Sequence, residues 1–301
     1  MKNFDIYADV TNRIIEQLEQ GIIPWQRPWT GVIDGPVKHK TGKPYSILNQ
    51  MLLGKPGEYL SFLECKQAGG SVKKGAKSRT VVFYKAYGHV QQDENGNVIL
   101  DDEGNIKVKV VPLLRYSNVF HIDDCEGIAP KWDKPTEPRD LPLDQEAENI
   151  LADYSKRCGV RIEHAKQNEA YYSPLLDVIS LPKREQFPQM AEYYGTAFHE
   201  ATHSTGHKSR LNRINLLDNH FGSKAYANEE LVAEIGSAAI LHSIGIETSS
   251  SSRNNAAYIQ NWLTALHNDK RLIVSAASKA DKAVRMILNL KAESEATEEV
   301  A

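Results

Sequence analysis

Near the start of the chain, apolar residues recur every four positions, as they do along one face of a helix, at Ile6, Val10, Ile14 and Leu18. Gly21 follows the last of them, where a helix can end. The pattern therefore predicts a helix over residues 5–19, with its apolar face buried against the rest of the domain.

A β-type pattern occupies the middle of the first half. Residues 80–84, 98–100 and 106–111 are rich in β-branched, aromatic and other apolar side chains. Hydrophilic turn sequences separate the later runs, at 93–96 and 101–104, so we expect a protruding hairpin here. Together with the first helix, these runs predict an α+β fold, a small curved sheet with helices.

The second half begins after a segment with linker composition, residues 129–143, which holds four prolines among charged residues. Beyond it, the apolar spacing predicts helices near 145–154, 192–205, 226–245, 252–267 and 273–290. Short strands are expected at 160–162, 170–173 and 177–181. We thus expect an N-terminal domain (1–128), a linker (129–143), a mainly helical domain with a short sheet (144–292) and an acidic disordered tail (293–301).

Composition is that of a globular protein, with 41% hydrophobic and 25% charged residues in a chain of 301. No apolar run approaches the roughly 20 residues needed to cross a bilayer, and the N-terminus lacks the apolar core of a signal peptide. The cysteines are odd in number and far apart in the sequence, at Cys65, Cys125 and Cys158. This usage predicts a reducing compartment, and we expect a cytoplasmic protein without a membrane partner.

The sequence His199-Glu200-Ala201-Thr202-His203 has the spacing of a metal site. Residues four apart lie on one face of a helix, so both imidazoles can reach one zinc ion. Glu200 lies beside such an ion rather than on it, and we expect it to be the catalytic base that takes a proton from a metal-bound water. His207 is a weaker ligand candidate, because Gly206 interrupts the helix before it.

A catalytic zinc site usually has three protein ligands and one water. The third ligand is expected from the predicted helix at 226–245, where Glu230 and Glu234 are four residues apart and share a face. We assign Glu230 as the metal ligand and Glu234 as the acceptor of a hydrogen bond from a ligand histidine. Glu229 points about 100° away around the helix, and it is the alternative third ligand.

Charge is unevenly distributed, although the net charge is only −3. From residue 38 to 85, ten cationic residues face two acidic ones, whereas residues 86–126 carry three cationic and eight acidic ones. Cations interleaved with aromatic rings are typical of grooves for single-stranded nucleic acid; the alternative is a solvated basic face with its rings in the core. The DNA contacts that we expect are Lys43, Tyr45, Lys73, Lys74, Lys77, Arg79 and Lys85.

Several segments also match a known family in order along the chain. In the second half these are Ala170–Pro174, Asp177–Pro182, Phe198–Arg213 and Glu229–Glu234. They resemble the zincin-like metallopeptidase domain attached to plasmid antirestriction proteins of the ArdC family. In the first half, Pro24–Trp29, Thr41–Asn49 and Lys73–Lys85 are similar to that family's single-stranded-DNA-binding domain. The match spans most of residues 4–245, and the acidic segment 93–106 resembles an insertion.

The resemblance implies a mobile-element protein of the bacterial cytoplasm, plasmid-borne or conjugative, that protects entering DNA from restriction. Its expected partners are single-stranded DNA and an unidentified protein or peptide substrate, and its expected cofactor is Zn²⁺ or another divalent metal. The expected chemistry is metal-assisted amide hydrolysis, with His199, His203 and Glu230 as ligands. We also expect the 177–181 strand to present an edge to which an extended peptide can pair.

Two other functions compete with an active zinc peptidase joined to a DNA-binding module. One is a DNA-binding protective protein whose metal domain is structural or catalytically silent. The other is an interaction protein with no enzymatic activity, which the intact Glu200 disfavours. A structural zinc site is usually closed by four protein ligands, and the sequence offers three.

Overall fold

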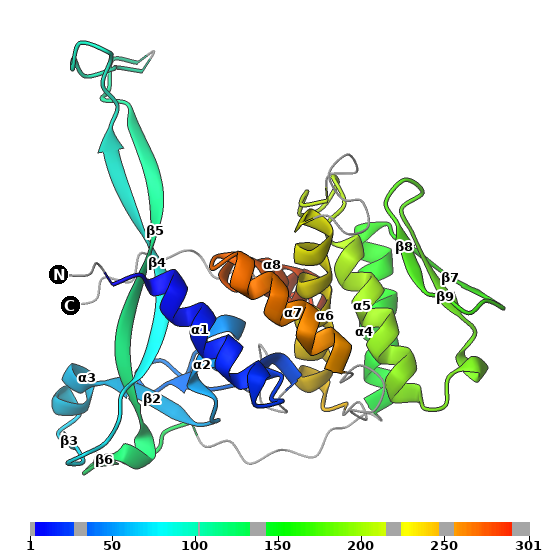
Figure 1. The fold of residues 1–301 in the computed structure, drawn as a ribbon, viewed down its shortest axis with the longest axis horizontal. Helices are drawn as coiled ribbons and strands as arrows, with labels where there is room; N and C mark the ends of the chain where they lie inside the picture. The colour runs from blue at the N-terminus through cyan, green and yellow to red at the C-terminus, as the bar shows by residue number, and fades with distance from the viewer. Residues whose placement is uncertain are drawn as a thin grey trace.

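The structure, a computed structural model, describes residues 4–26, 35–101, 103–132, 143–214, 224–246 and 256–290. Most of the predicted linker, Trp29 and the predicted tail at 293–301 lie outside the described residues. The predicted α+β architecture is confirmed, with a curved sheet in the first half and a mainly helical second half (Figure 1).

The first half is built on a four-stranded sheet with the order β1-β2-β5-β4. Its strands are β1 (Val37–Lys38), β2 (Glu58–Ser61), β4 (Arg79–Val90) and β5 (Val108–His121). A second, two-stranded sheet pairs β3 (Ser71–Val72) with β6 (Cys125–Glu126). The helices are α1 (Ile6–Glu19), α2 (Ile47–Leu53) and α3 (Phe62–Gln67), with single 3-10 turns at Pro24–Gln26 and Ile122–Asp124.

The predicted protruding hairpin is present as a long two-stranded arm that leaves the body of the protein (Figure 1). Its strands β4 and β5 pair antiparallel from Arg79 opposite Val119 to Val90 opposite Val108. The arm's tip contains two similar turns. In the first turn, Asp93 accepts hydrogen bonds from the backbone amides of Asn95 and Asn97. In the second, Asp101 accepts from those of Glu103 and Asn105.

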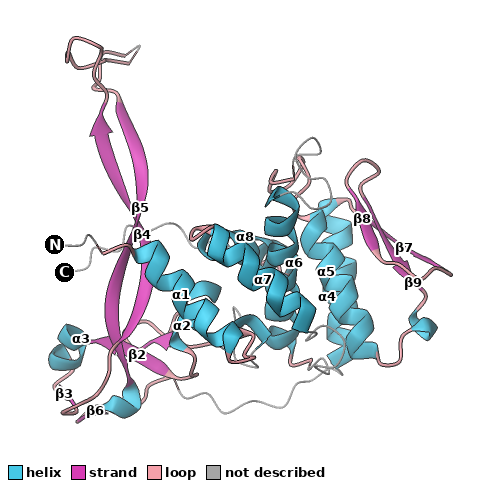
Figure 2. Cartoon of the chain, in the orientation of Figure 1, coloured by secondary structure: helices cyan, strands magenta, loops and turns pink. Residues whose placement is uncertain are grey.

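The second half is mainly helical, and Figure 2 shows its helices side by side with a small sheet on the outer flank. The helices are α4 (Leu143–Cys158), α5 (Met190–Ser204), α6 (Lys224–Ile244), α7 (Ala256–Asn268) and α8 (Leu272–Ile287). The strands are β7 (Arg161–Ala165), β8 (Tyr171–Ser173) and β9 (Val178–Pro182), and Arg184–Gln186 forms a 3-10 turn. None of the described helices has both the length and the apolarity to cross a bilayer.

The sheet order corrects one expectation. The strand at 177–181, observed as β9, is central, because β7 pairs with it in parallel and β8 pairs with it antiparallel. All five residues of β9 are buried. Both of its edges are therefore occupied, and an incoming peptide can pair only with β7 or β8.

One apolar core extends through both halves. Val10 and Ile14 of α1 belong to the same buried cluster as Ile273 and Val274 of α8. The 3-10 turn that follows α1 packs on α7, where the ring of Trp25 meets Trp262 edge-on at 5.0 Å. The two predicted domains therefore share a core, and a fragment ending near residue 128 would expose the apolar face of α1.

The first residues of the predicted linker are held by the N-terminal half. The backbone amides of Lys131 and Trp132 donate to the buried carboxylate of Glu58, at 2.6 and 2.5 Å. The ring of Trp132 lies against Gly42, where a Cβ atom would come within 2.7 Å of it. Gly42 also has a φ of +69°, so both its conformation and its small size are required here.

Candidate metal centre

Helix α5 presents the two histidines of the H-E-x-x-H sequence on one face. Its opposite side is anchored by fully buried apolar residues such as Phe198 and Ala201, which leaves His199 and His203 half-buried. Their Nε2 atoms face each other at 3.1 Å. The helix ends at Ser204, before Gly206, as the sequence predicts.

Glu230 of α6 approaches both histidines. Its carboxylate oxygens lie 3.6 Å from Nε2 of His199 and 3.6 Å from Nε2 of His203. Within the described residues, these three form the one cluster of at least three His, Cys, Asp or Glu side chains whose donor atoms all lie within 4.8 Å of one another. Ligands of a tetrahedral zinc ion at about 2.0–2.1 Å are about 3.3 Å apart, so the donor set fits a divalent cation.

The electrostatics of Glu230 also suit a ligand. Burial alone would raise the pKa of Glu230, but the hydrogen bond from His199 and the charges of His203 and His199 outweigh it. The pKa is lowered to about 2, helped by a hydrogen bond from Tyr226. The carboxylate is therefore ionised at neutral pH, and it is available to a cation without losing a proton.

A glycine sets the spacing between the two helices that build the site. A Cβ atom on Gly236 of α6 would lie 2.7 Å from the Cγ2 atom of Thr202 on α5. Thr202 is fully buried, and its hydroxyl donates to the carbonyl of Phe198. Any larger residue at 236 would push α6, and Glu230 with it, away from the two histidines.

Glu229, the alternative ligand, lies behind His203 rather than at the donor cluster. Its Oε1 atom is 3.3 Å from Nδ1 of His203, the ring nitrogen that faces away from His199. Arg213 holds the same carboxylate with two hydrogen bonds, at 2.8 and 3.0 Å, and also donates to the carbonyl of Thr202. Glu229 is thus placed to orient the His203 ring, a contact that the sequence pattern does not predict.

We predict that Glu229→Ala lowers the affinity for Zn²⁺ about 10- to 100-fold, the usual cost of removing a carboxylate that orients a ligand histidine. Glu230→Ala is expected to cost more, because it removes a donor atom. Calorimetric titration of the metal-free protein measures both affinities. Equal losses in the two variants would contradict the distinction, and Glu169→Ala, at an exposed position, is the control.

The other predicted site residues lie at the margin of the cluster. Glu234 is 3.9 Å from Nδ1 of His199, near it but beyond hydrogen-bonding distance. His207 is outside the helix, with its Nδ1 atom 2.7 Å from the hydroxyl of Ser209, and does not join the donor cluster. Glu200 is 8% exposed on the turn between the two histidines, and its charge acts on His203.

An ion pair between Arg210 and Asp177, here called the Asp177 clamp, fixes the segment after α5 to the small sheet. Arg210 donates to both carboxylate oxygens of Asp177, which also accepts from the hydroxyl of Tyr172 at 2.8 Å. Nε of Arg210 reaches back to the carbonyl of Ser204, the last residue of α5. Asp177 has a φ of +50°, a conformation that Asp and Asn tolerate better than most residues.

The Asp177 clamp predicts a pH-dependent stability. Burial alone would raise the pKa of Asp177, but hydrogen bonds from Arg210 and Tyr172 and the charges of Arg210 and His207 lower it. Because the folded pKa is below the unfolded value of about 3.9, the stabilisation is present above that value and is lost as pH falls through the folded pKa. Asp177→Asn should cost about 1–3 kcal/mol at pH 7 and progressively less as the pH falls below about 3.9, as measured by urea unfolding. A loss that does not change with pH would contradict this.

The predicted DNA contacts are scattered over the N-terminal half. Lys43, Lys74, Lys77 and Lys85 are exposed, whereas Lys73 donates to the carbonyl of Asp123 and Arg79 to that of Leu53. Tyr45 requires a correction: it is only 7% exposed, and its ring packs edge-on against Tyr59. Its ring fills the core and is not accessible to a base.

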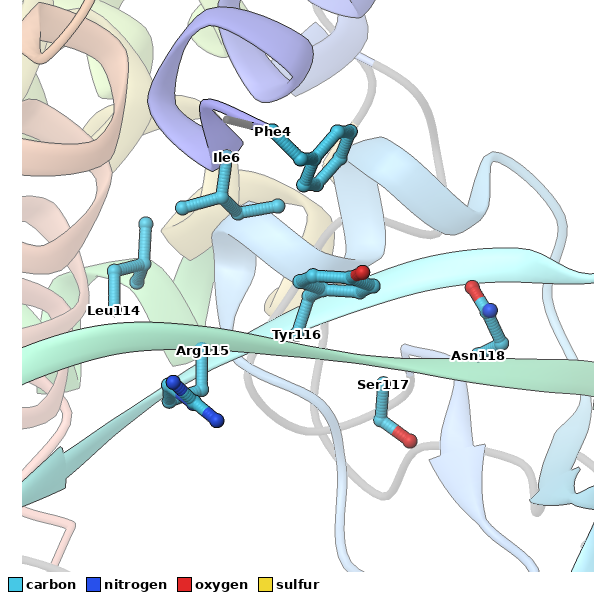
Figure 3. A pocket seen from close by; sticks show the side chains of 7 residues that line it. All are labelled: Phe4, Ile6, Leu114, Arg115, Tyr116, Ser117 and Asn118. Carbon is cyan, nitrogen blue, oxygen red and sulfur yellow. The ribbon is translucent and has the colours of Figure 1, made fainter. Parts of the chain in front are cut away.

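A hollow of about 530 Å³ lies between the start of α1 and β5, and none of the metal-site residues lines it. Figure 3 shows Leu114, Tyr116 and Asn118 pointing toward α1, while Arg115 and Ser117 point to the opposite side of the strand. The ring of Phe4 already packs on that of Tyr116, with 5.0 Å between centroids.

Two family models match this chain, one in each half. Residues 4–120 match the family model of the N-terminal domain of anti-restriction factor ArdC, and residues 145–279 match that of a zincin-like metallopeptidase. The crystal structure of metal-free antirestriction protein ArdC from plasmid R388 is similar, with a TM-score of 0.73 and 34% identity, and covers 95% of this chain and 98% of that one. Its Mn(II)-bound structure gives 0.71 and 33%, with the same coverage.

Curated relatives are similar over nearly the whole of this chain. Two DNA primases TraC of Escherichia coli are each 35% identical to it, over 94% and 91% of the chain, but the chain spans only 27% and 19% of their lengths. The protein y4eC of Sinorhizobium fredii is 30% identical, with 92% of this chain and 90% of that protein covered.

Proposed function

This chain belongs to the ArdC family of antirestriction proteins, and we propose that it protects DNA of a mobile element from restriction in the bacterial cytoplasm. In this proposal the N-terminal half binds single-stranded DNA, and the C-terminal half is a metal-dependent peptidase-like domain. The observation that supports it most strongly is the His199–His203–Glu230 cluster within a chain that is similar over 95% of its length to ArdC of R388.

His199, His203 and Glu230 would hold the metal ion, Zn²⁺ or another divalent cation such as the Mn(II) of the R388 relative. When bound, such an ion supplies Lewis acidity, which polarises a carbonyl and makes water a better nucleophile at neutral pH. The three donors found among the described residues leave a position for water or substrate, unlike the four donors of a closed structural site. This count favours a catalytic site over the structural alternative.

Glu200 is the proposed proton carrier. It follows His199 on α5 and is 8% exposed, so it lies beside the donor cluster and is largely shielded from bulk water. In amide hydrolysis it would accept a proton from the attacking water and deliver it to the departing nitrogen. The hydroxyl of Tyr226 donates a hydrogen bond to the Glu230 carboxylate, and it would hold Glu230 in place.

The proposed DNA-binding activity predicts binding of the full-length protein to a fluorescent oligothymidylate at low salt. Affinity should fall steeply as salt rises, because each neutralised phosphate of a single strand releases about 0.7 counterion. Chelator should not affect binding, since the described cluster of metal donors lies in the other half. Fluorescence anisotropy measures this, and absence of binding at low salt would refute the DNA-binding part.

Antirestriction itself is tested by plasmid transfer. A plasmid with cleavage sites should enter a restricting recipient more efficiently when the gene for this protein is present, and a non-restricting recipient should show no difference. An equal effect in both recipients would indicate a role in transfer rather than in protection. No effect in either would refute the proposal.

A further inference from the structure

The β4–β5 arm has two faces with different side chains. In an antiparallel pair, two directly opposed residues point to the same face. Successive pairs along the strands point to opposite faces in turn. The register therefore places Phe83 beside Arg115, Lys85 beside Leu113, Tyr87 beside Val111, and His89 beside Lys109 on one face. We call the six charged and aromatic residues among these the ribbon face: Phe83, Lys85, Tyr87, His89, Lys109 and Arg115.

The opposite face of the arm is partly covered by helices. Val82 and Leu114 point that way and are buried in the main core, and the hollow beside Tyr116 is roofed by the start of α1 (Figure 3). At the base of the ribbon face, Val81 and Val119 pack on Tyr45 and Tyr59. Beyond that base its four cationic and histidine side chains are exposed, and Phe83 and Tyr87 are half-buried.

The charge of the ribbon face suits a polyanion. Neither β4 nor β5 contains an aspartate or a glutamate, so none of its cations has a carboxylate partner on these strands. The ammonium of Lys85 lies 5.9 Å from the ring centroid of Tyr87, which places charge and ring side by side. At about 3.4 Å per residue, the stretch from Lys109 to Arg115 is about 20 Å long.

The arm's tip marks where this surface ends. Beyond Val90 and before Val108 the sequence turns acidic, with Asp93, Glu94, Asp101 and Glu103 all exposed. Carboxylates repel phosphates, so a nucleic-acid strand on the ribbon face would stop short of the tip. The arm thus has a basic surface along its strands that could follow a nucleic-acid strand, and this surface ends where the acidic tip begins.

We propose that the ribbon face is the track for single-stranded DNA, an assignment that rests on the proposed DNA-binding function. Arg115, Lys85 and Lys109 contact phosphates along the strand, and the rings of Phe83 and Tyr87 stack on bases. Half-buried rings between exposed cations fit unpaired bases, whose faces are open, and not a duplex, whose bases are already stacked. Of the six residues of the ribbon face, Lys85 alone is among the DNA contacts that the sequence predicts.

The test uses full-length protein and three charge-reversal variants, with binding to oligothymidylate measured by anisotropy over a salt series. Lys85→Glu combined with Arg115→Glu should lower affinity and reduce the slope of log affinity against log salt by about 1.4, since two phosphate contacts are lost. Lys156→Glu with Lys166→Glu makes the same change of charge at exposed positions in the C-terminal half and should keep the wild-type slope. The third variant reverses Lys74 and Lys77, in the loop before β4.

Tyr87→Ala separates stacking from charge. It should weaken binding about 5- to 150-fold with an unchanged salt slope, and thermal unfolding should be unchanged because Tyr87 lies on the arm, outside the buried clusters. A duplex of the same length should be less affected by Tyr87→Ala than the single strand. An equal effect on both would overturn the assignment of the ring to unpaired bases.

The outcomes separate the track from the broader function. If wild type binds oligothymidylate but the Lys85/Arg115 variant behaves like the Lys156/Lys166 control, the track is refuted and DNA binding stands. If only the Lys74/Lys77 variant loses affinity, the strand lies on the loop before β4 and the ribbon face is refuted. If wild type itself does not bind, the proposed DNA-binding function fails.

Discussion

Replacing His203 with alanine is expected to abolish retention of divalent metal, from about one ion per chain to none after desalting. The substitution removes one of the three donors and leaves His199 and Glu230, with oxygen and nitrogen 3.6 Å apart, as a two-donor site open to water. His199→Ala should have the same effect, since each histidine contributes its Nε2 atom to the cluster. Metal content is measured by elemental analysis, and affinity for Zn²⁺ and Mn²⁺ by calorimetric titration.

His207→Ala is the matched control for the metal prediction. His207 lies four residues beyond His203 and is the same residue type, but it follows the end of α5 and bonds Ser209 instead of joining the cluster. The variant should keep its metal and wild-type affinity. Stoichiometric metal in a His199→Ala, His203→Ala double variant would refute the site.

The sequence predicted those features that depend on neighbours along the chain. Helix α1 follows from the spacing of Ile6, Val10 and Ile14, and its observed start at Ile6 agrees because Asp5 caps it by accepting from the amides of Tyr7 and Ala8. The paired histidines follow in the same way from the four-residue spacing. Each of these features is a property of one helix, so no distant contact is needed to predict it.

Features that depend on distant packing were not predictable in the same way. Helical geometry shows that Glu229 and Glu230 point in different directions, but which one faces α5 depends on how α6 is rotated, and the contact of Gly236 with Thr202 helps to fix that. The central position of β9 depends on its parallel pairing with β7, which joins residues 161–165 to 178–182. Arg213, 16 residues before Glu229, gave no pattern that marks it as a partner.

The error about Tyr45 has a similar cause. An aromatic ring among lysines fits both a stacking platform and a core residue, and composition does not distinguish them. The structure buries Tyr45 against Tyr59, while Tyr87, in the same basic region of the sequence, lies on the arm. The distinction comes from tertiary packing for Tyr45 and from the register of β4 with β5 for Tyr87, and composition reveals neither.

The effect on chemistry is tested by Glu200→Gln, which should keep the metal and the fold while lowering peptide hydrolysis about 10²- to 10⁴-fold, the usual contribution of a positioned general base. Glutamine keeps the size of glutamate but cannot accept the proton. The substrate class is tested with a fluorescence-quenched peptide library, with and without single-stranded DNA. Glu192→Gln, the same substitution in the first turn of the same helix, should leave hydrolysis unchanged.

Each outcome of the Glu200→Gln experiment assigns a different role to the site. Loss of metal in the variant would make Glu200 a ligand and would contradict the separation of base from ligands, since the donor cluster consists of His199, His203 and Glu230. Metal-loaded wild type that cleaves nothing, with or without DNA, would favour the silent-domain alternative. Hydrolysis that depends on Glu200 and on metal, but not on Glu192, would establish a peptidase. A structural metal site does not require a carboxylate that lies beside the ion without binding it, whereas hydrolysis requires a general base.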